Sequence, residues 1–325
     1  MDKLSSLRQP VEQELARYKD LFDSALAHDD DFLGQALSYV RQRKGKMMRP
    51  ILVLLMAKEV GEVSVNSLRS AVTLELLHTA SLVHDDVVDE SGERRGQRSV
   101  NAVYDNKVAV LVGDYLLSTS LLQAAQTNNI RVVEIISRLG GTLSEGEVAQ
   151  LANIRREEIT EEAYFHIIHN KTAALFAACA ELGAISAGGT DEYVEKARKF
   201  GEIIGLCFQI RDDIFDYYDD ASIGKPTGND MMEGKLTLPA IYAIKQSANE
   251  DVHRWAKNVK AGCATAEEIA KLVEYTKQNG GIEYAEKRMK ALHNEALSLL
   301  DKHWHNEEVK AALKDYIDFV VERSL

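Results

Sequence analysis

Helix-breaking residues are scarce in this chain of 325 residues, which contains only 4 prolines. Long stretches can therefore continue as uninterrupted helix. Apolar residues recur at steps of three and four, as in residues 64–89, a run that holds neither glycine nor proline. No stretch alternates convincingly with a period of two, so strands are not predicted. The pattern predicts a single all-α domain over residues 1–325, a large bundle of roughly ten or more helices.

Local signals place the ends of several helices. Thr160, followed by two glutamates, is typical of a helix start. Thr265 and Glu268 have the spacing of a capping box, and Asn306 is expected to cap the last helix. Helices are predicted for residues 11–27, 51–60, 64–89, 107–126, 131–152, 160–187 and 191–218, and loops for residues 90–99 and 219–234.

The bulk composition excludes some classes of function. A formal net charge of -12 argues against nucleic acid as the main partner, because phosphate binding is driven by Lys and Arg. A phosphate ligand would need bridging cations or a local basic patch. The 3 cysteines have no metal-binding or disulfide spacing, and Cys179 and Cys207 are expected to be buried thiols. No apolar run has the ~20 residues of a membrane span, so we expect a cytoplasmic protein with at most peripheral membrane contact.

Two aspartate clusters share the spacing DDxxD, Asp85-Asp86-x-x-Asp89 and Asp212-Asp213-x-x-Asp216. Residues four apart lie on one helix face, so the first and last carboxylates of each cluster project together. They repel each other unless a cation lies between them. Mg²⁺ suits such a site, because it prefers oxygen and takes one or two carboxylates plus substrate phosphate. Apolar neighbours on both sides of each cluster argue against a merely solvated acidic face.

Basic residues follow or precede both clusters. Five lie close together at Arg41, Arg43, Lys44, Lys46 and Arg49, and others are Arg94, Arg95, Lys171, Lys225 and Lys235. Arginine grips phosphate oxygens bidentately, whereas lysine acts as a point charge. Together with the acidic clusters they predict a pocket for two diphosphates, one bridged by Mg²⁺ and the other held by cations alone. No Walker A loop, GxGxxG after a strand, GxSxG elbow or EF-hand loop is present.

These motifs resemble those of the trans-isoprenyl diphosphate synthases, the polyprenyl synthetase family, and most closely its long-chain members, such as the octaprenyl and heptaprenyl diphosphate synthases. The similarity covers nearly the whole chain. The matching segments are Gly45-Lys46-x-x-Arg49-Pro50, HDDVVDESGERRG (84–96), Lys171-Thr172, FQIRDDIFD (208–216) and GKPTGNDMMEGKLTLP (224–239). The resemblance implies the isoprenoid synthase fold, a helical bundle around a central cavity, and a homodimer.

The resemblance also implies residue roles. It assigns Mg²⁺, about three ions per active site, mainly to Asp85, Asp89 and Asp212, with Asp86, Asp213 and Asp216 supporting. The allylic diphosphate would be bound by Arg94, Lys171, Lys225 and Lys235. Isopentenyl diphosphate would be bound by Lys46, Arg49, His78 and Arg95. Thr172 and Gln209 would turn oxygens toward the developing allylic cation.

The implied reaction is Mg²⁺-assisted ionisation of an allylic diphosphate, such as farnesyl or geranyl diphosphate, then condensation with isopentenyl diphosphate and elimination of a proton. The small residues Ala80 and Ser81 precede Asp85 where the family's short-chain members carry a bulky aromatic. The helix predicted for residues 64–89 should line a tunnel for the growing chain. The chain would pass Leu77 and Leu74, one and two turns deeper, rather than stop at them. An isoprene unit spans about one helical turn, so we expect a product of about C30–C45.

Several alternatives stay open. One is a shorter-chain farnesyl or geranylgeranyl diphosphate synthase of the same family. A class I terpene cyclase needs one DDxxD and no isopentenyl pocket, so the second DDxxD and the pair Lys46 and Arg49 argue against it. A non-catalytic subunit of a heteromeric synthase tends to lose an aspartate motif, and both are intact here. A helical Ca²⁺-binding or scaffolding protein leaves the basic segments unexplained.

Overall fold

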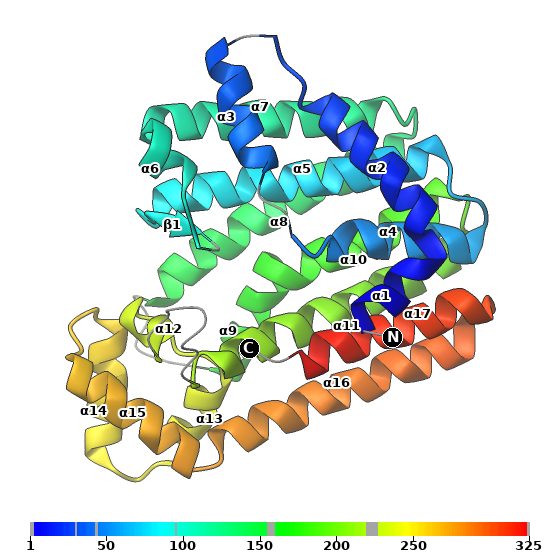
Figure 1. Ribbon diagram of the computed structural model, residues 1–325. Helices are drawn as coiled ribbons and strands as arrows, with labels where there is room; N and C mark the ends of the chain where they lie inside the picture. Colours follow the sequence, from blue (N-terminus) through cyan, green and yellow to red (C-terminus); the bar gives the residue numbers. More distant parts are fainter. Residues whose placement is uncertain are drawn as a thin grey trace. The chain divides into compact units, whose positions relative to one another are not determined.

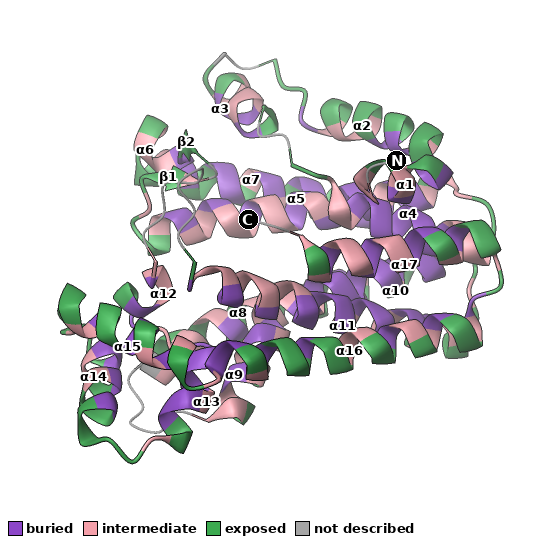
Figure 2. Ribbon diagram, turned by 60° about the horizontal axis from the view of Figure 1, so that its bottom comes forward, coloured by how far each residue is buried: buried purple, intermediate pink, exposed green. Residues whose placement is uncertain are grey.

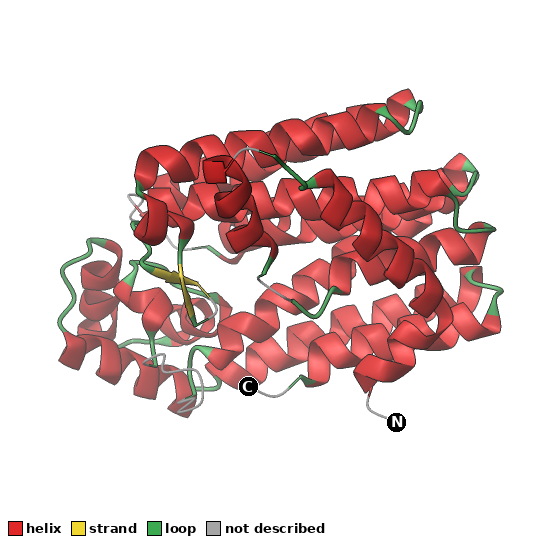
Figure 3. Cartoon of the chain, turned by 45° about the horizontal axis from the view of Figure 1, so that its top comes forward, coloured by secondary structure: helices red, strands yellow, loops and turns green. Residues whose placement is uncertain are grey.

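The computed structural model describes residues 3–29, 31–42, 45–94, 96–154, 160–218 and 227–323. These residues are almost entirely helical (Figure 3), which confirms the all-α prediction with its ten or more helices. They divide into two compact units. Unit 1 is Met1–Gly140, Leu175–Gly201 and Lys302–Tyr316, and unit 2 is Gly141–Ala174, Glu202–Asp301 and Ile317–Leu325. The single-domain assignment stays a prediction.

Unit 1 is built around two long neighbouring helices. These are α5 (Val65–Val88) and α7 (Asn106–Ala125), which run side by side (Figure 1). Helix α4 (Met48–Val60) is nearly all buried (Figure 2), because its apolar residues cover every face of the helix. The other elements are α1 (Lys3–Arg8), η1 (Gln9–Val11), α2 (Glu12–Ala25), α3 (Asp31–Arg41) and α6 (Val100–Tyr104).

Unit 2 holds the elements around the Lys171-Thr172 pair and those that follow the second DDxxD motif. They are α9 (Glu161–Ile168), η2 (His169–Ala173), α12 (Asn229–Met232), α13 (Leu238–Gln246), α14 (Glu250–Lys260) and α15 (Ala266–Gln278). Five helices contribute residues to both units, namely α8 (Ile130–Ile154), α10 (Ala174–Ser186), α11 (Asp191–Phe215), α16 (Gly281–His303) and α17 (Glu307–Glu322).

The predicted helix caps are confirmed. The Thr160 hydroxyl accepts the N–H of Ala163 at 3.1 Å, and Thr265 and Glu268 form a capping box. The Asn306 side chain accepts the N–H of Val309 at 3.2 Å. Cys179 and Cys207 are buried as expected. These features follow from local chemistry, which explains why the sequence alone identified them.

Two details of the sequence prediction were wrong. The loop at residues 90–99 contains a short antiparallel pair of strands, β1 (Glu93–Arg94) and β2 (Gln97–Arg98). Strands of 2 residues are too short to show an alternating pattern. The helix predicted for residues 160–187 is interrupted by the π-helical turn η2.

Helix α7 is the one candidate membrane span among the described residues, judged by length and composition alone. Only 39% of its apolar window is buried. Packing against α5 covers one side of α7, and apolar residues on the helix remain exposed.

Candidate active site

The turn η2 places the Lys171-Thr172 pair. The backbone shifts here from α-helical to π-helical hydrogen bonding, a change often found at functional sites. Helices α8 and α11 approach this turn very closely. A Cβ at Gly146 would lie 2.9 Å from the Asn170 Cβ, and one at Gly205 would lie 2.4 Å from the Ala173 Cα. Only glycine permits this approach, so both glycines help to position Lys171 and Thr172.

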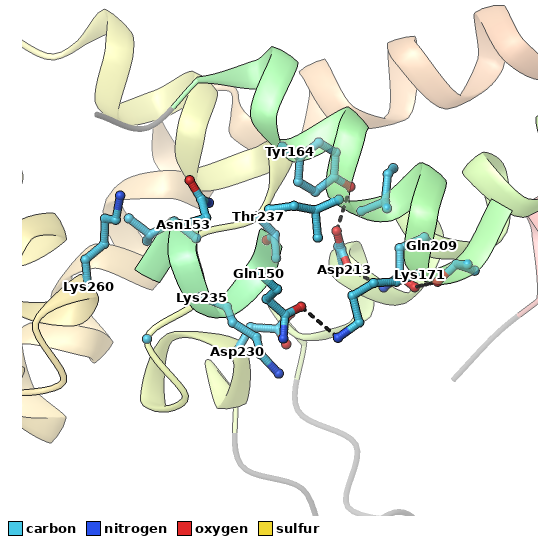
Figure 4. A pocket seen from close by; sticks show the side chains of 15 residues that line it. Gln150, Asn153, Tyr164, Lys171, Gln209, Asp213, Asp230, Lys235, Thr237 and Lys260 are labelled. Carbon is cyan, nitrogen blue, oxygen red and sulfur yellow. Dashed lines mark hydrogen bonds between the residues drawn. The ribbon is translucent and has the colours of Figure 1, made fainter. Parts of the chain in front are cut away.

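A cavity of about 190 Å³ lies in unit 2 next to this turn (Figure 4). The predicted site residues Lys171, Thr172, Gln209, Asp213 and Lys235 all line it. The Lys171 ammonium is 2.7 Å from a carboxylate oxygen of Glu147 and donates to the Gln150 side-chain oxygen at 2.9 Å. Five of the predicted residues therefore meet at one cavity.

A chain of hydrogen bonds runs along the cavity wall. The Thr172 hydroxyl donates to the Gln209 oxygen at 2.8 Å, and the Gln209 amide donates to Asp213 at 2.8 Å. The buried Tyr164 hydroxyl donates to the other Asp213 oxygen at 2.6 Å. Burial raises the Tyr164 pKa well above its usual value, so the phenol remains a donor. The chain fixes the orientation of the Gln209 amide.

Asp212 and Asp216, the other two aspartates of the second DDxxD motif, also accept hydrogen bonds. Arg323 donates to Asp212 at 2.5 Å and to the backbone oxygen of Phe208 at 2.9 Å. The two Asp216 oxygens accept the N–H groups of Asn229 and Asp230 at 3.0 and 3.2 Å, at the start of α12. The three carboxylates of the motif, two in the last turn of α11 and one just after it, thus have different partners.

These carboxylates fit a hard divalent cation. Burial raises the Asp213 pKa to about 7, and the charges of Asp212 and Asp216 add to the rise. Burial likewise raises the pKa of Asp230 well above its usual value. A cation would relieve this repulsion, and the donors are all oxygens. In the described part of the chain no three acidic, His or Cys side chains converge as a ready-made metal site. Mg²⁺ does not require one, because it takes few carboxylates together with water and phosphate.

The first motif lies at the end of α5 in unit 1. Asp85 is half-buried, Asp86 is buried and Asp89 is exposed. The Arg94 Nε atom is 2.5 Å from Asp86. Arg94, which is predicted to bind the allylic diphosphate, therefore neutralises the buried carboxylate of Asp86. The strand pair β1–β2 holds Arg94 in place for this contact.

A second cavity, of about 490 Å³, lies in unit 1 and is lined by three predicted ligands, Arg49, His78 and Arg94. Lys46 is exposed between the lining residues Gly45 and Met47, and its backbone oxygen accepts a hydrogen bond from Arg8 at 2.8 Å. Arg49 and Arg94, two of the predicted cations, thus line one cavity, and Lys46 lies next to its lining residues in the chain.

The predicted chain-length residues occupy one stretch of α5. Leu74, Leu77 and Ala80 are buried, and the Ser81 hydroxyl donates to the His78 backbone oxygen at 2.9 Å. None of them lines either of the two cavities, so their role in a tunnel stays a prediction. The predicted ligands Arg95 and Lys225 lie outside the described residues.

The sequence prediction did not include Tyr164, Arg323, Arg8 or Glu75. Glu75 lies three residues before His78, so helical spacing could have indicated it. Tyr164, Arg323 and Arg8 act through contacts with residues far away in the sequence, and no local pattern identifies such contacts.

Comparisons with known proteins agree with this arrangement. A family model described as "Polyprenyl synthetase" matches residues 30–276. The all-trans-nonaprenyl-diphosphate synthase (geranyl-diphosphate specific) of Rhodobacter capsulatus is 36% identical over 93% of this chain and 92% of its own. The crystal structure of a geranylgeranyl pyrophosphate synthase from Bacteroides thetaiotaomicron has a TM-score of 0.88 and 48% identity, covering 99% of this chain and 100% of that one. That of a decaprenyl diphosphate synthase from R. capsulatus has a TM-score of 0.91 and 34% identity, covering 98% of each.

The all-α fold and these structural matches define an isoprenoid synthase type of protein. The extent of the family match then settles the narrower class. The chain belongs to the polyprenyl synthetase family, and it is a prenyltransferase. This confirms the family and enzyme class expected from the sequence motifs.

The contact of Tyr164 with Asp213 can be tested by a double-mutant cycle. Tyr164→Phe should lower the free energy of unfolding by about 1–3 kcal/mol, because the buried Asp213 loses a donor. In an Asp213→Ala background the same change should cost far less. Chemical unfolding measures both values, and equal losses in the two backgrounds would show that the hydroxyl does not act through Asp213.

Proposed function

We propose that this prenyltransferase condenses isopentenyl diphosphate with an allylic diphosphate, farnesyl or geranyl diphosphate, to give a longer polyprenyl diphosphate. The allylic C–O bond breaks, a C–C bond forms to the alkene of isopentenyl diphosphate, and a proton and inorganic diphosphate leave. The observation that carries the proposal is the unit 2 cavity, where Lys171 and Lys235 lie with Asp213 and the Thr172–Gln209 pair.

The chain's own residues supply binding and electrostatic stabilisation. Lys171 and Lys235 attract the allylic diphosphate and neutralise the charge that grows on it as it leaves. The fixed dipoles of Thr172 and Gln209 face the cavity without a rearrangement during reaction. Bound Mg²⁺, held by aspartates of the two motifs, would add Lewis-acid stabilisation of the leaving diphosphate. The departing diphosphate accepts the proton, so no protein base is needed.

The test of the proposal is product analysis. The purified chain, incubated with farnesyl diphosphate, radiolabelled isopentenyl diphosphate and Mg²⁺, should give labelled polyprenyl diphosphates that separate by chromatography. EDTA should abolish the reaction, and Asp85→Ala or Asp212→Ala should lower kcat by about 100-fold or more with little loss of folding. Full activity in EDTA would contradict the metal requirement, and an unlabelled cyclic hydrocarbon would favour a terpene cyclase.

We further propose a product of about C30–C45, on the grounds that Ala80 and Ser81 are too small to stop a chain that advances about one helical turn per isoprene unit. Ala80→Phe and Ser81→Phe should each shorten the product to about C15–C20. Chromatography of dephosphorylated products measures this. Unchanged product length in both variants would contradict the tunnel assignment.

A shorter product is the second candidate, because the geranylgeranyl pyrophosphate synthase of B. thetaiotaomicron is 48% identical to this chain. The nonaprenyl and decaprenyl synthases of R. capsulatus are 36% and 34% identical. Product analysis of the unaltered chain decides between the two.

We also propose that the enzyme is a homodimer formed through α7. Val110, Leu111, Leu121 and Leu122 are 40–66% exposed on this helix. Positions eleven residues apart lie three turns apart on the same face of a helix, so the two pairs form one apolar surface. A second copy of the chain would cover this surface.

A cytoplasmic location, with at most peripheral membrane contact for product release, remains part of the proposal.

The dimer can be tested by charge substitution. The unaltered chain should sediment at twice the 36.2 kDa chain mass. Leu111→Asp combined with Leu122→Asp should shift it to the monomer mass, because charges are depleted at interface cores. Val65→Asp, at an exposed apolar position on α5, is the matched control and should remain dimeric. A monomeric unaltered chain would contradict the proposal.

A further inference from the structure

Glu75 pairs with Arg49 in the unit 1 cavity. Glu75 lies on α5 three residues before His78, and all three side chains line the cavity. The Arg49 Nε atom is 3.2 Å from a Glu75 carboxylate oxygen. Their side chains are only 14% and 24% exposed, so the pair is partly shielded from water. Such a pair is stronger than one on an open surface.

The buried side chains around the pair carry no charge that competes with Glu75 for Arg49. Tyr18, Tyr316 and Cys179 are buried nearby, and burial raises the pKa of all three, so they stay neutral. The Tyr316 hydroxyl donates to the Met48 backbone oxygen at 2.9 Å and so fixes the first turn of α4, which carries Arg49. Among the described residues, Glu75 is the one ion-pair partner of Arg49.

The geometry of the contact leaves the other end of the guanidinium available. Glu75 accepts from Nε, and among the described side chains around the cavity none accepts a hydrogen bond from the terminal Nη atoms. Two terminal nitrogens held in this way form a fork that matches two oxygens of a phosphate group. Holding the side chain in advance also reduces the rotamer entropy that ligand binding would otherwise remove.

We propose that Glu75 is a positioning residue that orients Arg49 to grip the diphosphate of isopentenyl diphosphate. The inference rests on the proposed function, which places that substrate at Arg49. Glu75 is itself an anion in the cavity that would bind the anionic substrate. Charge alone predicts that removing Glu75 would strengthen diphosphate binding. Orientation predicts the opposite.

Steady-state kinetics separates the two effects. Glu75→Gln removes the charge with little change of size, and Glu75→Asp keeps the charge but withdraws it by one methylene. In both variants the KM for isopentenyl diphosphate should rise by about 10-fold or more, the scale of one charge-assisted hydrogen bond. The KM for the allylic diphosphate should stay within about twofold. An unchanged or lower KM for isopentenyl diphosphate overturns the proposal.

A double-mutant cycle tests whether Glu75 acts through Arg49. When Arg49→Gln is already present, Glu75→Gln should raise the KM for isopentenyl diphosphate no further. Additive increases would overturn the proposal. The control is Glu181→Gln, which breaks another unit 1 pair, Arg138 to Glu181 at 3.2 Å, outside both cavities. This control should leave both KM values unchanged.

The outcomes distinguish this inference from the proposed function. If the unaltered chain forms no product from the two diphosphates, the proposed function fails. If the unaltered chain is active and the Glu75 variants keep its KM values, only the positioning role fails. Thermal unfolding of both variants is measured alongside. If both are unfolded at the assay temperature, the carboxylate is structural, and the positioning role is overturned.

Discussion

The neutralisation of buried carboxylates is the constraint on which the site depends. A buried charge is costly unless it is paired and hydrogen-bonded. Asp86 is fully buried and meets Arg94, and Asp213 is buried and accepts from Tyr164 and Gln209. These contacts hold the carboxylates in position inside each unit. They also hold the Arg94 guanidinium and the Gln209 amide in a defined place. One set of contacts therefore stabilises the fold and arranges groups that are predicted to bind substrate.

Several arginines of this acidic protein are held in one orientation by neighbouring side chains. A chain with a net charge of -12 needs local basic groups to bind diphosphates, and an arginine is useful only when its nitrogens face the ligand. Asp86 holds Arg94, Glu75 holds Arg49, and Arg323 is held over the ring of Phe208, 3.9 Å from its centre. Under the proposed function, Asp86 and Glu75 would fix the arginines that bind the diphosphates.

The family relatives constrain the reaction more than the product. They share the fold over nearly the whole chain, yet those named above make geranylgeranyl, nonaprenyl and decaprenyl chains by their own descriptions. In the proposed function, ionisation and condensation depend on charged groups at fixed spacing, whereas product length depends on the size of a few side chains such as Ala80 and Ser81. A small difference in such side chains would change the product without changing the fold.

The sequence by itself determined the all-α class, the helix caps at Thr160, Thr265 and Asn306, and the two DDxxD motifs. All of these depend on neighbours within about one helical turn. Only the tertiary structure decided which partners the side chains have. The π-helical turn at Lys171 depends on the close approach of Gly146 and Gly205 from other helices. The partners Tyr164 and Arg323 come from distant segments, and no local pattern encodes such pairings.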